Sequence, residues 1–152
     1  MNIITYNVRG LGRGVKWAAI RRLIKKESVD MICIQETKKE TIEKSMCQSI
    51  WGDPAVSWEM QPAVNSAGGL LCLWCDKKFK LERKASGNGF IWLSGQWIKE
   101  AVQVNIVTVY SPCDIQNKRN LWEAIKQMKS ANQGGLGVFW EISTTQGILR
   151  KG

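Results

Sequence analysis

The sequence predicts a mixed α/β domain, and three features of its hydrophobic pattern indicate this. The chain opens with a strand-like, a helix-like and a second strand-like segment. More strand-like segments fill the middle of the chain, and a helix-like segment near the end precedes one more strand. Strands and helices arranged in this way bury their apolar faces in packed layers. Because no stretch of the 152 residues looks like a linker or a repeat, we expect one domain over residues 1–152.

The opening segments predict two parallel strands joined by a helix. Residues 2–8 alternate and carry β-branched and aromatic side chains, which is typical of a strand. Apolar residues recur at helical spacing over residues 15–27, and residues 28–36 contain a short apolar run. A strand, a helix and a strand in this order favour a right-handed crossover between parallel strands.

The rest of the chain predicts two more helices among several strands. A weaker helix is expected over residues 41–50 and a longer one over residues 117–130. Three tryptophans, Trp17, Trp92 and Trp122, are expected in the core. The other strand-like segments are residues 69–74, 79–83, 90–98, 102–110 and 136–140.

The charge balance favours a polyanionic partner. The chain has 22 Lys and Arg against 13 Asp and Glu, a formal charge of +9. A basic surface of this size favours nucleic acid first and an anionic membrane second, although basic residues can also serve solubility alone. Charged residues interrupt every apolar run well before the roughly 18 residues of a membrane span. The first eight residues also lack the features of a signal peptide. We therefore expect an intracellular protein without a membrane partner, with the nucleus as one place where it would meet DNA.

The cysteine and histidine content limits the kinds of disulfide, metal site and catalytic base that the chain can form. Five cysteines scattered through apolar segments predict reduced, buried thiols rather than a disulfide framework. Cys72 and Cys75 have redox or metal spacing, but alternation along a strand would point them to opposite faces, which favours a packing role. The sequence contains no histidine, which excludes a histidine base and a histidine-ligated zinc site from this chain.

Two polar residues end the first two predicted strands. Asn7 ends the first strand and Glu36 the second. Adjacent parallel strands place their carboxyl ends side by side, so these residues could share a site. A carboxylate with few companions suits Mg²⁺, which takes its other ligands from water and phosphate. The alternative is that Asn7 caps a turn and Glu36 is solvated.

A glycine-rich segment, Gly10–Gly14, follows the first strand. It fails the dinucleotide pattern because Val15 stands where the third glycine belongs, so no nucleotide cofactor is expected. The flanking basic residues Arg9, Arg13 and Lys16 could still contact nucleic-acid phosphates.

A further polar feature is Tyr110, which ends a strong predicted strand and whose hydroxyl could donate a hydrogen bond to a phosphate.

Together the chain's motifs resemble those of the endonuclease domain of LINE-type retrotransposons, particularly plant ones. That domain belongs to the endonuclease/exonuclease/phosphatase family. The matching segments, in order, are Tyr6–Gly12, Ile34–Lys38, Gly68–Leu70 and Val109–Pro112.

The resemblance implies a DNase I-like fold, an α+β-type four-layer sandwich with the active site at one edge. It implies a metal-dependent DNA phosphodiester hydrolase, with Mg²⁺ as the ion and Mn²⁺ as the alternative. Glu36 would ligate the metal, Asn7 would help to hold metal and phosphate, and Tyr110 would orient the scissile phosphate. The ion would polarise the phosphoryl oxygen.

The sequence also departs from the family's pattern. Where the family has Gly-Asp-Phe-Asn, the corresponding residues include Glu141 and Ser143, which we assign to catalysis as weak replacements. The family's final Asp-His pair has no counterpart. The motifs cover somewhat more than the front half of the family's domain, so we expect a C-terminally incomplete fold. Most of the second sheet would then be missing, leaving an open edge prone to self-association.

Three functions follow as hypotheses. The first is a catalytic DNA endonuclease. The second, which the departures favour, is a non-catalytic remnant that binds nucleic acid through its basic surface. The third, a nucleotide-binding module at the glycine segment, is disfavoured by the spacing.

Overall fold

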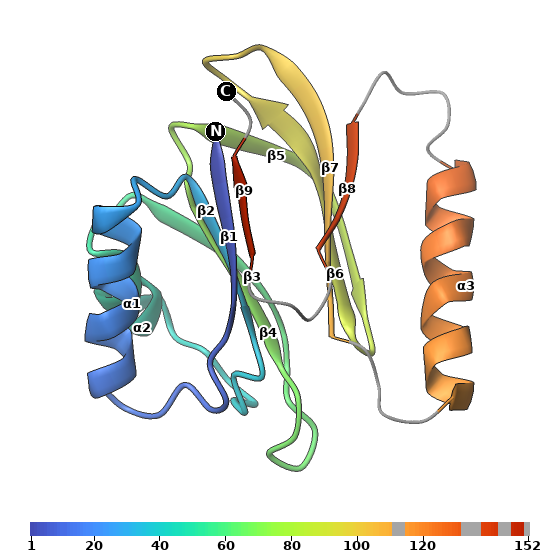
Figure 1. Ribbon diagram of the computed structural model, residues 1–152, viewed down its shortest axis with the longest axis horizontal. Coiled ribbons are helices and arrows are strands. Elements are labelled where there is room, and N and C mark those ends of the chain that lie inside the picture. Colours follow the sequence, from blue (N-terminus) through green and yellow to red (C-terminus); the bar gives the residue numbers. More distant parts are fainter. Residues whose placement is uncertain (111–114, 132–137, 143–146, 151–152) are drawn as a thin grey trace.

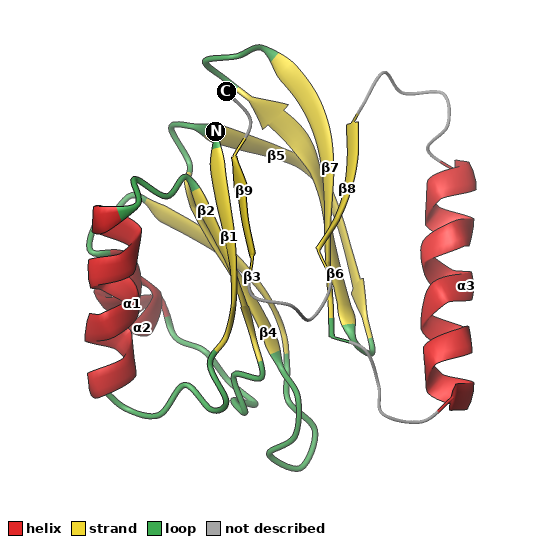
Figure 2. Ribbon diagram, in the orientation of Figure 1, coloured by secondary structure: helices red, strands yellow, loops and turns green. Residues whose placement is uncertain are grey.

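The chain folds into four layers, two facing β-sheets with helices on both outer sides (Figure 1). The computed structural model describes residues 1–110, 115–131, 138–142 and 147–150. Figure 2 shows helices on the outer face of each sheet. The four-layer α/β sandwich that the sequence predicts is therefore confirmed.

The first sheet has five strands in the order β3-β4-β2-β1-β9. Strands β1 and β2 are parallel, with Ile3 beside Met31 and Asn7 beside Gln35, as the opening pattern predicts. The short strand β9 (Gly147–Arg150) returns from the end of the chain to pair antiparallel with β1. The other elements of this half are β1 (Asn2–Asn7), α1 (Val15–Lys26), β2 (Met31–Gln35), α2 (Lys44–Trp51), β3 (Val56–Gln61) and β4 (Leu70–Cys75).

The second sheet has four strands in the order β5-β6-β7-β8. The expectation that most of this sheet would be missing is wrong, because residues 79–142 supply all four strands. Self-association through a sheet edge stays a prediction. The elements of this half are β5 (Phe79–Gly87), β6 (Phe90–Trp97), β7 (Val102–Val109), α3 (Ile115–Ala131) and β8 (Val138–Ile142).

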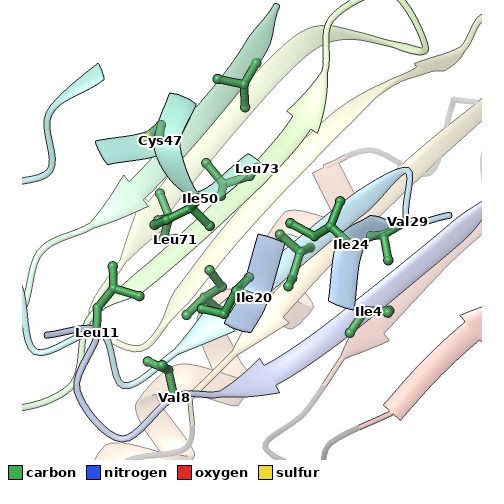
Figure 3. Packing of buried hydrophobic residues seen from close by; sticks show 13 residues of the cluster. Ile4, Val8, Leu11, Ile20, Ile24, Val29, Cys47, Ile50, Leu71 and Leu73 are labelled. Atoms are coloured by element: carbon green, nitrogen blue, oxygen red, sulfur yellow. The ribbon is translucent and has the colours of Figure 1, made fainter. Parts of the chain in front are cut away.

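Alternation along the strands divides the core into layers. On β1, Ile3 belongs to the cluster between the two sheets, whereas its neighbour Ile4 belongs to the cluster under α1 and α2. Figure 3 shows this second cluster, in which Ile20 and Ile24 of α1 lie over the sheet. Each such fully buried aliphatic side chain contributes about 1.5–3 kcal/mol.

A smaller cluster lies on the outer face of the second sheet and explains one wrong expectation. Trp92 is buried there, and Ala124 of α3 packs against the cluster. Trp122 was expected in the core but is 38% exposed. Two residues along a helix are about 200° apart, so a helix that packs through Ala124 turns Trp122 away from the sheet. Trp17 does pack against the cluster under the helices.

The cysteines behave as the sequence predicts for reduced thiols. Cys33, Cys47 and Cys72 are buried, Cys75 is half-buried, and these four are free. Burial raises the pKa of Cys47 to about 12. Cys113 lies outside the described residues. Within the described part of the chain, no helix is long and apolar enough to cross a membrane.

The space between the sheets changes from apolar to polar along the strands. On β1 the inward positions run from Ile3 to Thr5 and Asn7, and on β7 they run from Ile106 to Thr108. Thr5, Gln35 and Thr108 are all buried, and the Thr108 hydroxyl has no hydrogen-bond partner in the described part of the chain. Burying polar groups costs free energy, so this polar end marks a candidate site rather than a stabilising core.

Candidate functional site

The site begins where the parallel strands β1 and β2 end side by side. Asn7 is the register partner of Gln35, and Glu36 follows directly. The Asn7 Oδ1 accepts a hydrogen bond of 3.1 Å from the backbone N–H of Arg9, which forms a turn at the end of β1. Asn7 therefore shapes the loop that follows it, and it does so beside Glu36.

Glu36 bonds across the gap between the sheets. Its Oε1 accepts a hydrogen bond of 2.8 Å from the Tyr110 hydroxyl, although 74 residues separate the two in sequence. The carboxylate is thus held at the edge rather than simply solvated. Glu36 also has a left-handed backbone, with φ of 56°, which costs a residue other than glycine on the order of 1–2 kcal/mol. Strain of this kind is concentrated at functional sites.

Gln35 makes a second link between the same two strand ends. Its Nε2 donates a buried hydrogen bond of 3.1 Å to the backbone carbonyl of Val109. The last residue of β2 and the residue after it therefore bond to the last residue of β7 and the residue after it. These two contacts fix the distance between the sheets at the site.

The loops around Glu36 are held by backbone hydrogen bonds. Gly10 donates to the Glu36 carbonyl at 2.7 Å, and Thr37 donates to the Gly69 carbonyl at 3.2 Å. Gly69 has φ of 94°, and a Cβ placed on it would overlap the Thr37 hydroxyl. Only glycine fits at this position, because both the backbone and the available space exclude a side chain.

Comparison with solved structures identifies the fold that carries these residues. The chain is similar to the human Nocturnin catalytic domain, with a TM-score of 0.70, 13% identity, and 94% of this chain and 62% of that chain covered. An AP endonuclease from Archaeoglobus fulgidus gives a TM-score of 0.61, 14% identity, and coverage of 93% and 56%. An endonuclease/exonuclease/phosphatase family protein from Bacteroides thetaiotaomicron gives a TM-score of 0.64, 10% identity, and coverage of 93% and 61%.

This chain has the DNase I-like fold. It spans 56–62% of the length of these three structures. No protein-family model matches the sequence, and no curated protein matches it. At identities this low the likeness concerns the fold, and the chemistry has to be argued from the site residues themselves.

The three basic residues expected to bind nucleic acid are placed differently in this DNase I-like chain. Arg9 and Arg13 are exposed on the loop after β1. The Lys16 ammonium instead donates to the carbonyls of Val8, Arg9 and Gly10, at 2.9, 3.1 and 2.7 Å. An ammonium has three donors, so Lys16 is fully used in holding the loop. Its contact with nucleic acid stays a prediction.

The two residues expected to replace the Gly-Asp-Phe-Asn motif cannot be placed in the site. The backbone of Glu141 lies in β8, opposite Val107 of β7, so the two strands lead toward the same edge. The Glu141 side chain and the whole of Ser143 lie outside the described residues. Their catalytic roles stay predictions.

Metal binding rests on few donors. In the described part of the chain, no group of three or more Cys, Asp or Glu residues could hold a metal ion. Glu36 offers one carboxylate, and Asn7 offers an amide from the neighbouring strand. This set fits Mg²⁺, which in proteins is often held by one or two carboxylates together with water and substrate phosphate.

Sequence reasoning missed three residues that build the site. Gln35 and Thr37 were parts of a motif but had no role of their own. In the structure Gln35 links the sheets, and Thr37 lies buried against Gly69. Lys38 is exposed, has φ of 55°, and lies beside Gly10. Two signals could have pointed to them. A polar pair beside a predicted ligand suggests support for it, and a lysine in the same motif suggests a phosphate contact.

Gly69→Ala should destabilise the protein, because alanine would need a left-handed backbone and would overlap Thr37. We expect a loss of about 2–4 kcal/mol in the free energy of unfolding, measured by denaturant titration. Gly14→Ala is the control, since Gly14 has φ of −155° and open space around it. It should cost within about 1 kcal/mol. Equal losses in both variants would contradict this account of Gly69.

Proposed function

We propose that the chain binds a DNA phosphodiester at the ends of β1, β2 and β7, in a site of the divalent-metal-dependent phosphodiester hydrolase type. The observation that carries the proposal is the hydrogen bond between Tyr110 and Glu36. It brings a hard oxygen ligand and a hydroxyl donor together, with Asn7 on the adjacent strand. A phosphate bound here would take the hydroxyl hydrogen bond, while a metal would take the carboxylate.

Mg²⁺ is the proposed ion, with Mn²⁺ as the alternative. Glu36 would hold it directly and Asn7 would assist, because hard cations prefer carboxylate and amide oxygens. Bound there, the ion would polarise a phosphoryl oxygen and offset the charge that develops on it. The chain's own contribution is orientation. Tyr110 is fixed by its bond to Glu36 and by a 2.8 Å bond from its backbone N–H to the Gly89 carbonyl.

Charge around the site supports a nucleic-acid substrate. Arg9, Arg13 and Lys38 are exposed on the loops that flank Asn7 and Glu36, in a chain of net charge +9. Contacts to phosphates position a duplex without reading its sequence. The names of two similar structures agree with a phosphate ester site, since one is an AP endonuclease and the Nocturnin domain holds a sulfate anion.

Within this fold, LINE-type retrotransposon endonucleases are the proposed class. The motifs that carry this resemblance converge on one edge. Tyr6–Gly12 contains Asn7, Ile34–Lys38 contains Glu36, and Gly68–Leu70 lies against Thr37. The fourth motif supplies Tyr110. Four segments spread over more than 100 residues of sequence therefore supply one site, which supports reading them as a functional set.

Cleavage by this chain is proposed to be impaired. None of its 152 residues is a histidine, and general base catalysis typically contributes about a hundred- to ten-thousandfold. A second candidate function, non-catalytic binding of nucleic acid through the basic surface, is favoured by the same observation. The two candidate functions differ in whether Glu36 and a metal take part in binding the nucleic acid.

Supercoiled plasmid incubated with the purified chain and Mg²⁺ should be nicked no faster than with EDTA or with the Glu36→Ala variant. The reason is that no histidine is present to activate the attacking water. Gel electrophoresis of the plasmid over time measures this. Nicking by the wild-type chain that disappears in both controls would contradict the proposed impairment and show that another group serves as the base.

Binding of a duplex oligonucleotide should weaken as the salt concentration rises, and part of this salt dependence should come from the basic residues at the site. Replacing both Arg9 and Arg13 with alanine is expected to reduce the slope of log K against log salt by about 1.8, since each phosphate contact contributes about 0.9. Fluorescence anisotropy at several salt concentrations measures the slope.

The matched control removes the same charge elsewhere. Lys77 and Lys99 are exposed, and they lie near Lys78, which pairs with Asp30 just before β2. Their double alanine variant should keep the wild-type slope. If both double variants lower the slope equally, the DNA contacts are spread over the surface and the proposed site has no special part in them.

A further inference from the structure

A cavity of ≈ 240 Å³ lies beside Tyr110. Its walls come from the hairpin between β3 and β4 and from the two-residue turn between β5 and β6. Tyr110 therefore belongs both to the candidate site and to the cavity. Its hydroxyl bonds to Glu36, while the residue also lines the cavity. A ligand that fills the cavity would lie next to a group bound at the Tyr110 hydroxyl.

Two carboxamides line this cavity, one from each wall. Gln61 comes from the end of β3, and Asn88 comes from the turn between β5 and β6. Neither side chain has a hydrogen-bond partner among the described residues. Each carboxamide offers both donors and an acceptor. The apolar side chains of Pro62 and Val64 complete the wall on the hairpin side.

The walls are held before any ligand arrives. The Tyr110 N–H bonds to the Gly89 carbonyl, which fixes the turn that carries Asn88. On the other wall, Gly69 is packed against Thr37 so closely that a side chain is excluded. A preformed cavity loses less conformational entropy on binding than a mobile one.

We propose that this cavity receives a nucleobase of the DNA strand whose phosphate is bound at the Tyr110 hydroxyl, with Gln61 and Asn88 hydrogen-bonded to the base edge. The inference rests on the proposed function. Its chemistry is that of base recognition, because carboxamides match the paired donors and acceptors of a base edge. A flat ring against Pro62 and Val64 would satisfy the apolar part of the wall. The position beside Tyr110 selects a ligand that carries a base and a phosphate in one molecule.

The test compares two labelled single strands of about 12 nucleotides, an oligothymidylate and an abasic strand with the same sugar–phosphate backbone. Fluorescence anisotropy at low salt with Mg²⁺ measures both affinities. The wild-type chain should bind oligothymidylate about tenfold more tightly, the scale of one or two net hydrogen bonds. The double variant Gln61→Ala with Asn88→Ala should bind the two strands equally. Circular dichroism confirms that each variant is folded.

Gln96→Ala is the matched control, because it removes the same group from the opposite end of β6. It should keep the tenfold preference. Gln61→Glu, which conserves shape but removes the amide donors, provides a second variant should the alanine double variant fail to fold. It should lower the preference, because only Asn88 then keeps its amide donors.

The two strands test the proposed function and the nucleobase proposal by different readouts. Binding of the abasic strand that weakens in Glu36→Ala reports on the phosphate site and therefore on the proposed function. The difference between the strands reports on the cavity. A wild-type chain without base preference, or a double alanine variant that keeps the preference, would overturn the nucleobase proposal alone. No binding of either strand would overturn both proposals.

Discussion

Two consecutive residues, Gln35 and Glu36, link the two sheets by hydrogen bonds, and the candidate site depends on those contacts. Gln35 ends the central strand β2 and bonds to Val109, which ends β7, while Glu36 and Tyr110 directly follow these two strands and bond to each other. The first bond joins a side chain to a backbone carbonyl in a buried position, and it links the layers at this edge. An unpaired buried carboxamide would cost about 1–3 kcal/mol, so this link is strongly favoured. The second bond places a carboxylate against a hydroxyl.

Features that oppose stability gather around the same edge. Arg9, Glu36 and Lys38 all have left-handed backbones, and Thr108 is buried without a partner in the described part of the chain. Basic side chains are exposed on the adjoining loops and repel one another. These costs are met elsewhere, by the apolar layers between the sheets and under α1 and α2. An edge that is strained, polar and positively charged is suited to a phosphate ligand, which would satisfy the donors and offset the charge.

Much of the fold could be predicted from the sequence, because many helices and strands carry their own hydrophobic periodicity. The parallel pair β1 and β2 with α1 between them follows from alternation, helical spacing and crossover geometry. Strand β3 was missed although Val56, Trp58 and Met60 alternate with polar residues and pack against the cluster under the helices, which is the pattern of a half-buried strand. Strand β9 has four residues and is defined by pairing with β1, at the opposite end of the chain.

The site could be predicted only in part, for a related reason. Residue types at strand ends pointed to Asn7, Glu36 and Tyr110, and the structure brings Glu36 and Tyr110 into contact. The roles of Gln35 and Lys16 depend on contacts that no local pattern contains. Lys16 looked like a phosphate ligand in the sequence because it follows a glycine-rich segment. In the fold, three carbonyls of the preceding loop take its donors. Trp122 shows the same limit, since helical spacing does not say which stripe of a helix packs.

The most direct measurement of the central claim is Mn²⁺ binding, followed by the electron paramagnetic resonance of the free ion. Carboxylate sites that suit Mg²⁺ also suit Mn²⁺. The account predicts that the wild-type chain binds Mn²⁺ and that Glu36→Gln abolishes this binding. Glu59→Gln removes another half-buried carboxylate, one bonded to Lys84, and should leave the binding unchanged. Mn²⁺ binding by Glu36→Gln equal to that of the wild type would contradict the assignment of this edge as a metal and phosphate site.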